Sequence, residues 1–184
     1  MTAEQEKLIE EIIDYELEMF LEVQNVGGMA NCQQHPKAFR VMRKMSHSVQ
    51  DTAFLQSYLN DLKQAKEQQR NFMVEKYALM DNLIPNLVED DRIDIIVDRE
   101  AEWRDTMANM YPHIIGREDS AHFRRYLQSE LQTLSPASLA SYYDTVVTAF
   151  NQGRNLVQER YAYLMQLLGY ASLDEREKQL ADEG

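Results

Sequence analysis

Two glutamates interrupt the apolar faces of predicted helices, and a charged side chain at such a position calls for a physical explanation. Glu16 and Glu100 are 84 residues apart. The apolar stripes that they interrupt consist of Ile9, Ile12, Ile13, Phe20 and Val23 in the first helix and Ile93, Ile96 and Val97 in the second. A buried carboxylate requires a cation, hydrogen bonds or a metal ion, or its pKa rises. Arg40, Arg43 and Arg124 on the predicted short helices are its natural partners.

Three interpretations of these glutamates stay open. Each could form a structural ion pair that ties its helix to a short helix, as buried pairs often do. Each could instead be a functional carboxylate, either a general acid or base or an anchor for a ligand. The third interpretation is that the stripe is shallow and that Glu16 reaches water.

A polar loop between Gln24 and His35 is the second candidate, because it has no counterpart later in the chain and loops often carry function. Gln24 and Asn25 could contact a ligand there. Cys32 would be a catalytic nucleophile if Arg40, Arg43 or the start of the next helix lowered its pKa. The alternative is that Cys32 is an inert, packed side chain.

A repeated polar stripe is the third candidate. Ser57, Gln68, Asn71 and Glu75 are predicted to project from one flank of a long helix, with Arg70 and Tyr77 on the other flank. The copies of the four polar residues are Ser141, Gln152, Asn155 and Glu159. Such residues either pack against the other helices of their own half or line a shared cavity.

Metal-binding patterns are weak in this chain. The Glu-x-x-His motif of di-iron bundles is missing from the sequence, and Asp119-x-x-His122 falls at a helix start, where capping residues are common. Symmetry would allow a carboxylate cluster of Glu16, Glu75, Glu100 and Glu159. No HExxH motif, glycine-rich phosphate loop or GxSxG motif occurs. We therefore predict no cofactor.

The helices that must position these residues occur in two similar segments of the sequence. Residues 55–78 and 139–162 are identical at ten of 24 positions without a gap. The sequence predicts helices over 3–24, 36–47, 51–80, 90–110, 120–132, 135–168 and 172–181. We therefore predict an all-α fold: one single-domain helical bundle over residues 1–184, built from two tandem repeats about a pseudo-twofold axis. Repeat one covers 3–84 and repeat two 88–168, each a long, a short and a long helix, followed by the C-terminal short helix 172–181.

Composition narrows the functional classes. Of 184 residues, 44% are hydrophobic and 27% are charged, which is ordinary for a globular protein. The net charge of -12 argues against binding nucleic acid or an anionic membrane. A single cysteine, an acidic N-terminus and the lack of a long apolar run indicate a cytoplasmic protein.

Several segments together resemble a known family. EIIDYELEMFLEVQNVGGMANCQ, FRVMRKMS, SYLNDLKQA, RNFMVEKYALM and the late GY are similar to a bacterial domain-of-unknown-function family, number four-one-two-five. The resemblance covers nearly the whole chain and implies a helical protein without an assigned activity. The sequence departs from the family pattern at Gln69, where a glycine is usual, as at Gly153.

We predict a small-molecule-binding bundle with a pocket in the first repeat, which would also suit an enzyme acting on a small anionic or polar metabolite. Glu16 would be the acid, base or anchor, and Arg40 and Arg43 would hold a carboxylate or phosphate. The ligand would be oriented by Gln24, Asn25, Tyr58, Asn71 and Glu75. The alternatives are a regulatory module whose long helices present a groove or a homodimer face, and a carboxylate-bridged metal protein.

Overall fold

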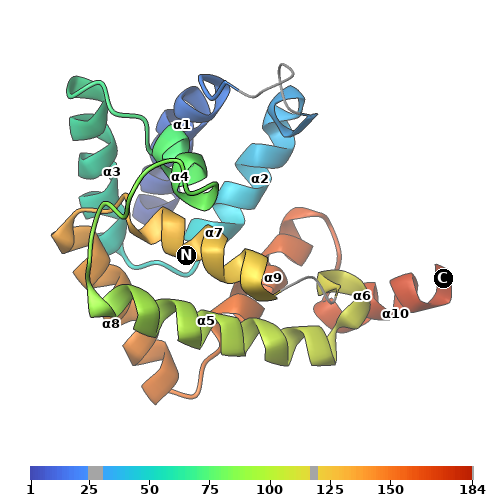
Figure 1. The fold of residues 1–184 in the computed structure, drawn as a ribbon. Coiled ribbons are helices and arrows are strands. Elements are labelled where there is room, and N and C mark those ends of the chain that lie inside the picture. The colour runs from blue at the N-terminus through green and yellow to red at the C-terminus, as the bar shows by residue number, and fades with distance from the viewer. Residues whose placement is uncertain (25–30, 117–119, 184) are drawn as a thin grey trace.

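The computed structural model describes residues 1–24, 31–116 and 120–183, apart from the side chains of Asn31 and Cys32. Throughout these ranges the ordered elements are helices and no strand occurs, which confirms the predicted all-α class. The first half of the chain contains α1 (Ala3–Leu21), the 3-10 helix η1 (Asn31–Gln34), α2 (Pro36–His47), α3 (Thr52–Glu67) and α4 (Phe72–Met80). The second half contains α5 (Asp91–Met110), α6 (Pro112–Ile115), α7 (Ser120–Leu131), α8 (Pro136–Asn151) and α9 (Leu156–Leu167), and α10 (Leu173–Glu183) follows (Figure 1).

Local capping explains where the principal helices begin. Thr2 and Gln5 form a reciprocal capping box at α1, as their spacing suggests. Asp51 caps α3 by accepting from the backbone N–H of Phe54, and Ser135 caps α8 in the same way. The first helix ends at Leu21, three residues before the predicted end.

The two long helices predicted over 51–80 and 135–168 are each broken into a helix pair, so these predictions were wrong. Gln69 and Gly153 adopt left-handed backbone conformations with φ of 57° and 68° and end α3 and α8. The chain then restarts because Asn71 accepts hydrogen bonds from two backbone N–H groups of α4, and Asn155 caps α9. The break also turns Arg70 toward Glu75, whereas a continuous helix would hold them on opposite flanks.

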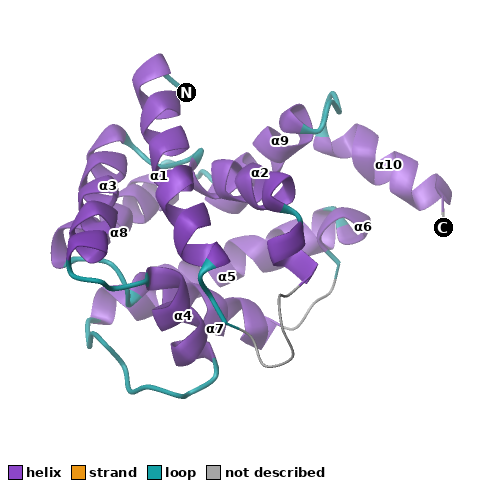
Figure 2. Ribbon diagram, turned by 90° about the horizontal axis from the view of Figure 1, so that it is seen from above, coloured by secondary structure: helices purple, strands orange, loops and turns teal. Residues whose placement is uncertain are grey.

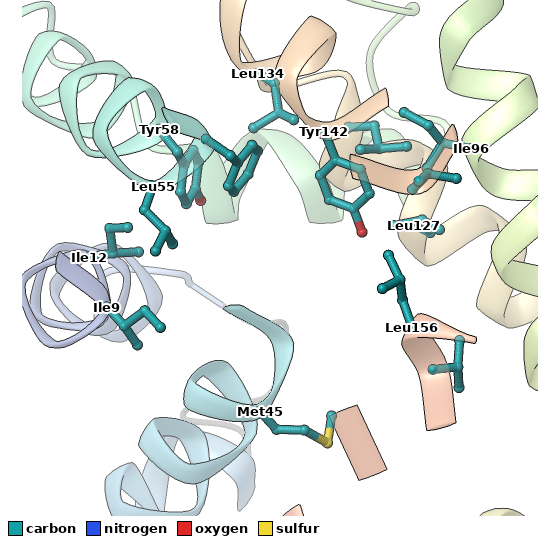
Figure 3. Packing of buried hydrophobic residues seen from close by; sticks show 14 of the residues in the cluster. Ile9, Ile12, Met45, Leu55, Tyr58, Ile96, Leu127, Leu134, Tyr142 and Leu156 are labelled. Carbon is teal, nitrogen blue, oxygen red and sulfur yellow. The ribbon is translucent and has the colours of Figure 1, made fainter. Parts of the chain in front are cut away.

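One contiguous hydrophobic core contains residues from both halves. Figure 3 shows Tyr58 near Leu55 and Ile12, and Tyr142 near Leu127, with Leu134 between the two tyrosines at the top of the view. The ring of Phe54 stacks on that of Tyr58 and meets the ring of Tyr142 edge-on, with centroids 5.6 and 5.4 Å apart. These aromatic contacts join α3 to α8 and hold the halves in one body.

The last helices lie to one side of this core. α6 lies in the connection between the predicted helices 90–110 and 120–132, where the sequence predicted no helix, and α10 packs against α6 and α9. α10 extends away from the rest of the bundle in both views (Figures 1 and 2). Within the described ranges, every helix is too short or too polar to cross a membrane.

Candidate functional site

Glu16 is the centre of a buried polar cluster built by three helices. It lies on α1 with no solvent exposure and accepts hydrogen bonds from Arg43 Nε at 2.8 Å and Arg43 Nη2 at 2.6 Å. The hydroxyl of Tyr58 on α3 donates to the same carboxylate at 2.9 Å. Nε2 of His47 lies 3.1 and 3.2 Å from its two oxygens. The apolar stripe of α1 therefore carries its carboxylate into a site that satisfies it fully.

Helical periodicity explains why α2 supplies two of these partners. Arg43 and His47 are four residues apart, so their side chains leave the same face of α2. An ionised carboxylate only accepts hydrogen bonds, so His47 donates to Glu16 in those states that carry a hydrogen on Nε2; Nη2 of Arg43, also a donor, lies 3.3 Å from the same nitrogen. Burial acts to raise the pKa of Glu16, but Arg43 and His47 outweigh it and hold that pKa well below its usual range. Glu16 is therefore a carboxylate at neutral pH.

The cluster continues across the boundary between the halves. Glu130 of α7 accepts from Arg43 at 3.1 and 3.3 Å, and from Nζ of Lys76 at 3.1 Å. Lys76 also donates to the hydroxyl of Tyr126 at 3.0 Å. Burial acts to raise the pKa of Glu130, yet the cations Arg43 and Lys76 lower it to about 2. The charges of two carboxylates and two permanent cations thus balance one another. All three guanidinium nitrogens of Arg43 donate hydrogen bonds to these carboxylates.

Glu100 has a smaller cluster of its own. Its carboxylate accepts from both Nη atoms of Arg160 on α9 and from the hydroxyl of Tyr142, which lies 2.6 Å away. Burial and the Glu100 carboxylate raise the pKa of Tyr142 well above its usual value, although Arg160 opposes them. The predicted partner of Glu100, Arg124, instead pairs with Asp98 at the surface. The prediction was wrong because position 124 lies on the outer face of α7.

A pocket of about 270 Å³ separates the two clusters. Its walls come from α2 and α3 of the first half and from α5, α7, α8 and α9 of the second. Arg43, His47 and Tyr58 form part of one wall, and Glu100 and Arg160 form part of the other. The predicted pocket lay within the first repeat alone, whereas this one needs both halves.

Two buried polar atoms at this pocket have no partner anywhere in the described part of the chain. They are Nε of Arg160, a hydrogen-bond donor, and Oε1 of Gln50, an acceptor. Both residues line the pocket, with exposed fractions of 9% and 3%. A buried polar group without a partner costs about 1–3 kcal/mol, so such groups in a native protein call for an explanation.

The predicted site residues divide into three groups. Glu16, Arg43 and Tyr58 meet directly, as described above. Arg40 pairs with Glu10 and Asp14 at the surface. Asn71 donates to the backbone carbonyl of Met19 and caps α4, Glu75 pairs with Arg70, and Gln24 is exposed. Asn25 and the side chain of Cys32 lie outside the described residues.

Sequence reasoning missed the residues that complete the site: Gln50, His47, Lys76, Tyr126, Glu130, Tyr142 and Arg160. His47 could have been found from its spacing to Arg43 on one helix face. Tyr142 could have been found because it stands 84 residues after Tyr58, at an identical position of the two similar segments. No sequence signal identifies Glu130, because it partners a helix of the other half.

The carboxylate cluster that symmetry suggested is not formed. Glu16 and Glu100 lie in separate arginine clusters, and Glu75 and Glu159 pair with Arg70 and Arg154. The described residues also contain no group of three or more histidine, cysteine, aspartate or glutamate side chains placed to hold a metal ion.

A family model described as "Protein of unknown function (DUF4125)" matches residues 6–178. The match confirms the predicted resemblance and covers all of the helices that build the pocket. No curated protein and no solved structure matches the chain.

Proposed function

Because the chain belongs to the DUF4125 family, whose description gives no activity, we propose from the site alone that this protein binds a small molecule in the pocket between its halves. The observation that carries the proposal is the pairing of a cavity with unsatisfied buried groups. Arg160 and Gln50 both line the 270 Å³ space, and Nε of the one and Oε1 of the other are buried without a partner in the described chain. A ligand with a matching acceptor and donor would supply a hydrogen-bond partner to each atom and so remove the free-energy cost of leaving both unpaired.

The surrounding clusters favour binding over simple packing, because they hold the pocket wall rigid. Arg43 and Arg160 are fixed by several hydrogen bonds each, so their positions do not depend on a ligand. Such preorganisation lowers the entropy cost of binding. A deep pocket that holds Glu16 among converging arginines would favour a small-molecule site over an interaction module. Arg43 and Arg160 line this pocket, whereas Glu16 is fully buried and is not one of its lining residues.

Blocking the pocket tests the proposal. Ser46 of α2 lines the pocket and is only partly buried, so Ser46→Trp would occupy the space without removing a member of either cluster. Ser141→Trp on α8 is the matched control, because Ser141 is also partly buried but does not line the pocket.

A fragment library screened by saturation-transfer NMR should give ligands that bind the wild-type protein and Ser141→Trp but not Ser46→Trp. The proposal is wrong if no fragment binds, or if every binder is retained by Ser46→Trp. Circular dichroism melting curves would show that both variants are folded.

We also infer that the two halves arose by internal duplication in a bacterial, cytoplasmic protein. The duplication is supported by α2 and α7, and by α3 and α8, whose bounds differ by 84 residues at both ends. An experimental structure in which these pairs failed to superpose would contradict it. The cytoplasmic assignment rests on the single cysteine, and secretion of the protein by its host would contradict that assignment.

A further inference from the structure

We propose that the pocket takes an uncharged, fused-ring aromatic molecule that carries one hydrogen-bond acceptor and one donor. This inference rests on the proposed small-molecule function and specifies the chemical class of the ligand. It is argued from the size of the pocket, its aromatic lining, and the state of the charges around it.

The volume of the pocket limits the size of the ligand. A protein cavity of about 150 Å³ holds benzene, so a cavity of 270 Å³ corresponds to a ligand of about ten non-hydrogen atoms. Two fused rings have this size. A nucleotide or a coenzyme exceeds this volume and would extend out of the pocket.

The side chains that line the pocket limit the chemical class of the ligand. Six aromatic side chains face the pocket: Phe54, Tyr58, Phe123, Tyr126, Tyr142 and Tyr161. They come from both halves, and buried leucines such as Leu127 and Leu131 complete the wall. Aromatic rings pack favourably in stacked or edge-on arrangements, so this wall favours a planar aromatic ligand over a flexible polar one.

The ion pairs around the pocket limit the charge of the ligand. Arg43 is neutralised by Glu16 and Glu130, and Arg160 is neutralised by Glu100. A ligand carboxylate or phosphate would have to compete with these protein carboxylates, and it would lie close to Glu100 and Glu130 in a poorly solvated space.

Arg104 is the remaining arginine at the pocket. Its guanidinium lies over the ring of Phe123, 5.4 Å from the ring centroid. The experiment below therefore includes an anion, whose tightest binding would overturn the charge argument.

The unsatisfied atoms supply the polar specification. Arg160 Nε can donate one hydrogen bond and Gln50 Oε1 can accept one. A ligand that offers only carbon surface leaves both atoms unpaired. One acceptor and one donor on an aromatic ring system would complete the hydrogen bonding of this wall.

Three fused-ring probes distinguish the classes by NMR titration: quinolin-2-one, which is uncharged with an N–H and a carbonyl, naphthalene, and the anion 2-naphthoate. We expect quinolin-2-one to bind most tightly. Loss of one neutral hydrogen bond weakens binding by about 2- to 10-fold, so Gln50→Leu should weaken quinolin-2-one by that factor and leave naphthalene unchanged. Gln50→Met serves as a second variant if Gln50→Leu does not fold.

The inference is overturned if 2-naphthoate binds most tightly, or if naphthalene equals quinolin-2-one and the Gln50 variants change neither. These outcomes differ from failure of the proposed function. In that case none of the three probes binds in a manner that Ser46→Trp prevents.

Discussion

The turns that divide the predicted long helices allow a prediction with an internal control, because the same left-handed turn contains glutamine in the first half and glycine in the second. Gln69 and Gly153 occupy equivalent turns at φ of 57° and 68°. After each turn, a backbone N–H returns to a carbonyl five residues earlier, from Arg70 to Ala65 and from Arg154 to Ala149. This is the hydrogen bonding of a helix end that favours glycine.

The magnitude follows from two opposing terms. A side chain in the left-handed conformation costs about 1–2 kcal/mol, whereas glycine loses about 0.5–1 kcal/mol more backbone entropy on folding. Gln69→Gly should therefore stabilise the fold by about 0.5–1 kcal/mol. A Cβ added at Gly153 would meet no atom within 4 Å, so Gly153→Gln should destabilise it by a similar amount for backbone reasons alone.

Urea unfolding followed by circular dichroism measures both changes, and a domain of this size should shift its melting temperature by about 2–4 °C for each kcal/mol. The double variant Gln69→Gly with Gly153→Gln should return close to wild type. If Gln69→Gly destabilises the protein, or if Gly153→Gln is neutral, the backbone argument is refuted. Gln69 would then be held by side-chain contacts that outweigh its conformation.

Three further predictions concern the buried clusters and one cap. Glu16→Ala should cost about 3–5 kcal/mol of unfolding free energy, because it leaves Arg43 without its principal partner, whereas Asp14→Ala at a surface pair should cost under about 1 kcal/mol; equal losses in urea unfolding would contradict this. The pKa of Glu130 lies at about 2 in the folded protein, below its ordinary 4.5, so its contribution of about 3 kcal/mol is complete above pH 5 and is lost as the pH falls toward 2. Glu130→Gln should flatten the stability profile between pH 5 and 2, and an unchanged slope would exclude this assignment. Asn71→Ala should cost about 1–2 kcal/mol through loss of the α4 cap, measured against wild type by thermal melting, and a neutral result would show that the cap is dispensable.

The all-helical class could be predicted because it depends on local chemistry. Caps such as Thr2, Asp51 and Ser135 act within one turn, and the apolar period identifies the buried face. The break in the long helices escaped prediction for the same reason. In the first half, Gln68 to Asn71 contains neither glycine nor proline, and the left-handed Gln69 and the cap at Asn71 show that the chain turns there. In the second half, Gly153 followed by Asn155 did carry the signal of a helix end and a new cap.

The partners of the buried glutamates could be predicted only in the first half. The basic helix beside Glu16 offered Arg43, and the structure uses it. The equivalent position on α7 is Leu127, so α7 gives no cation to Glu100. Arg160 provides the charge from α9 instead, at the position that Lys76 occupies in the first half. A pattern read along one chain segment cannot identify a partner that another helix brings in.

The same comparison describes how the two halves meet at the pocket. His47 has Leu131 as its counterpart, just as Arg43 has Leu127, and all four residues line the pocket. At these positions α2 presents charged or polar side chains and α7 presents leucines. Glu130 of α7 pairs with Arg43 across the boundary, whereas the leucines have no polar group to offer to α2. The lining therefore combines an ion-paired side with an apolar side, and the proposed aromatic ligand with one polar edge would match both.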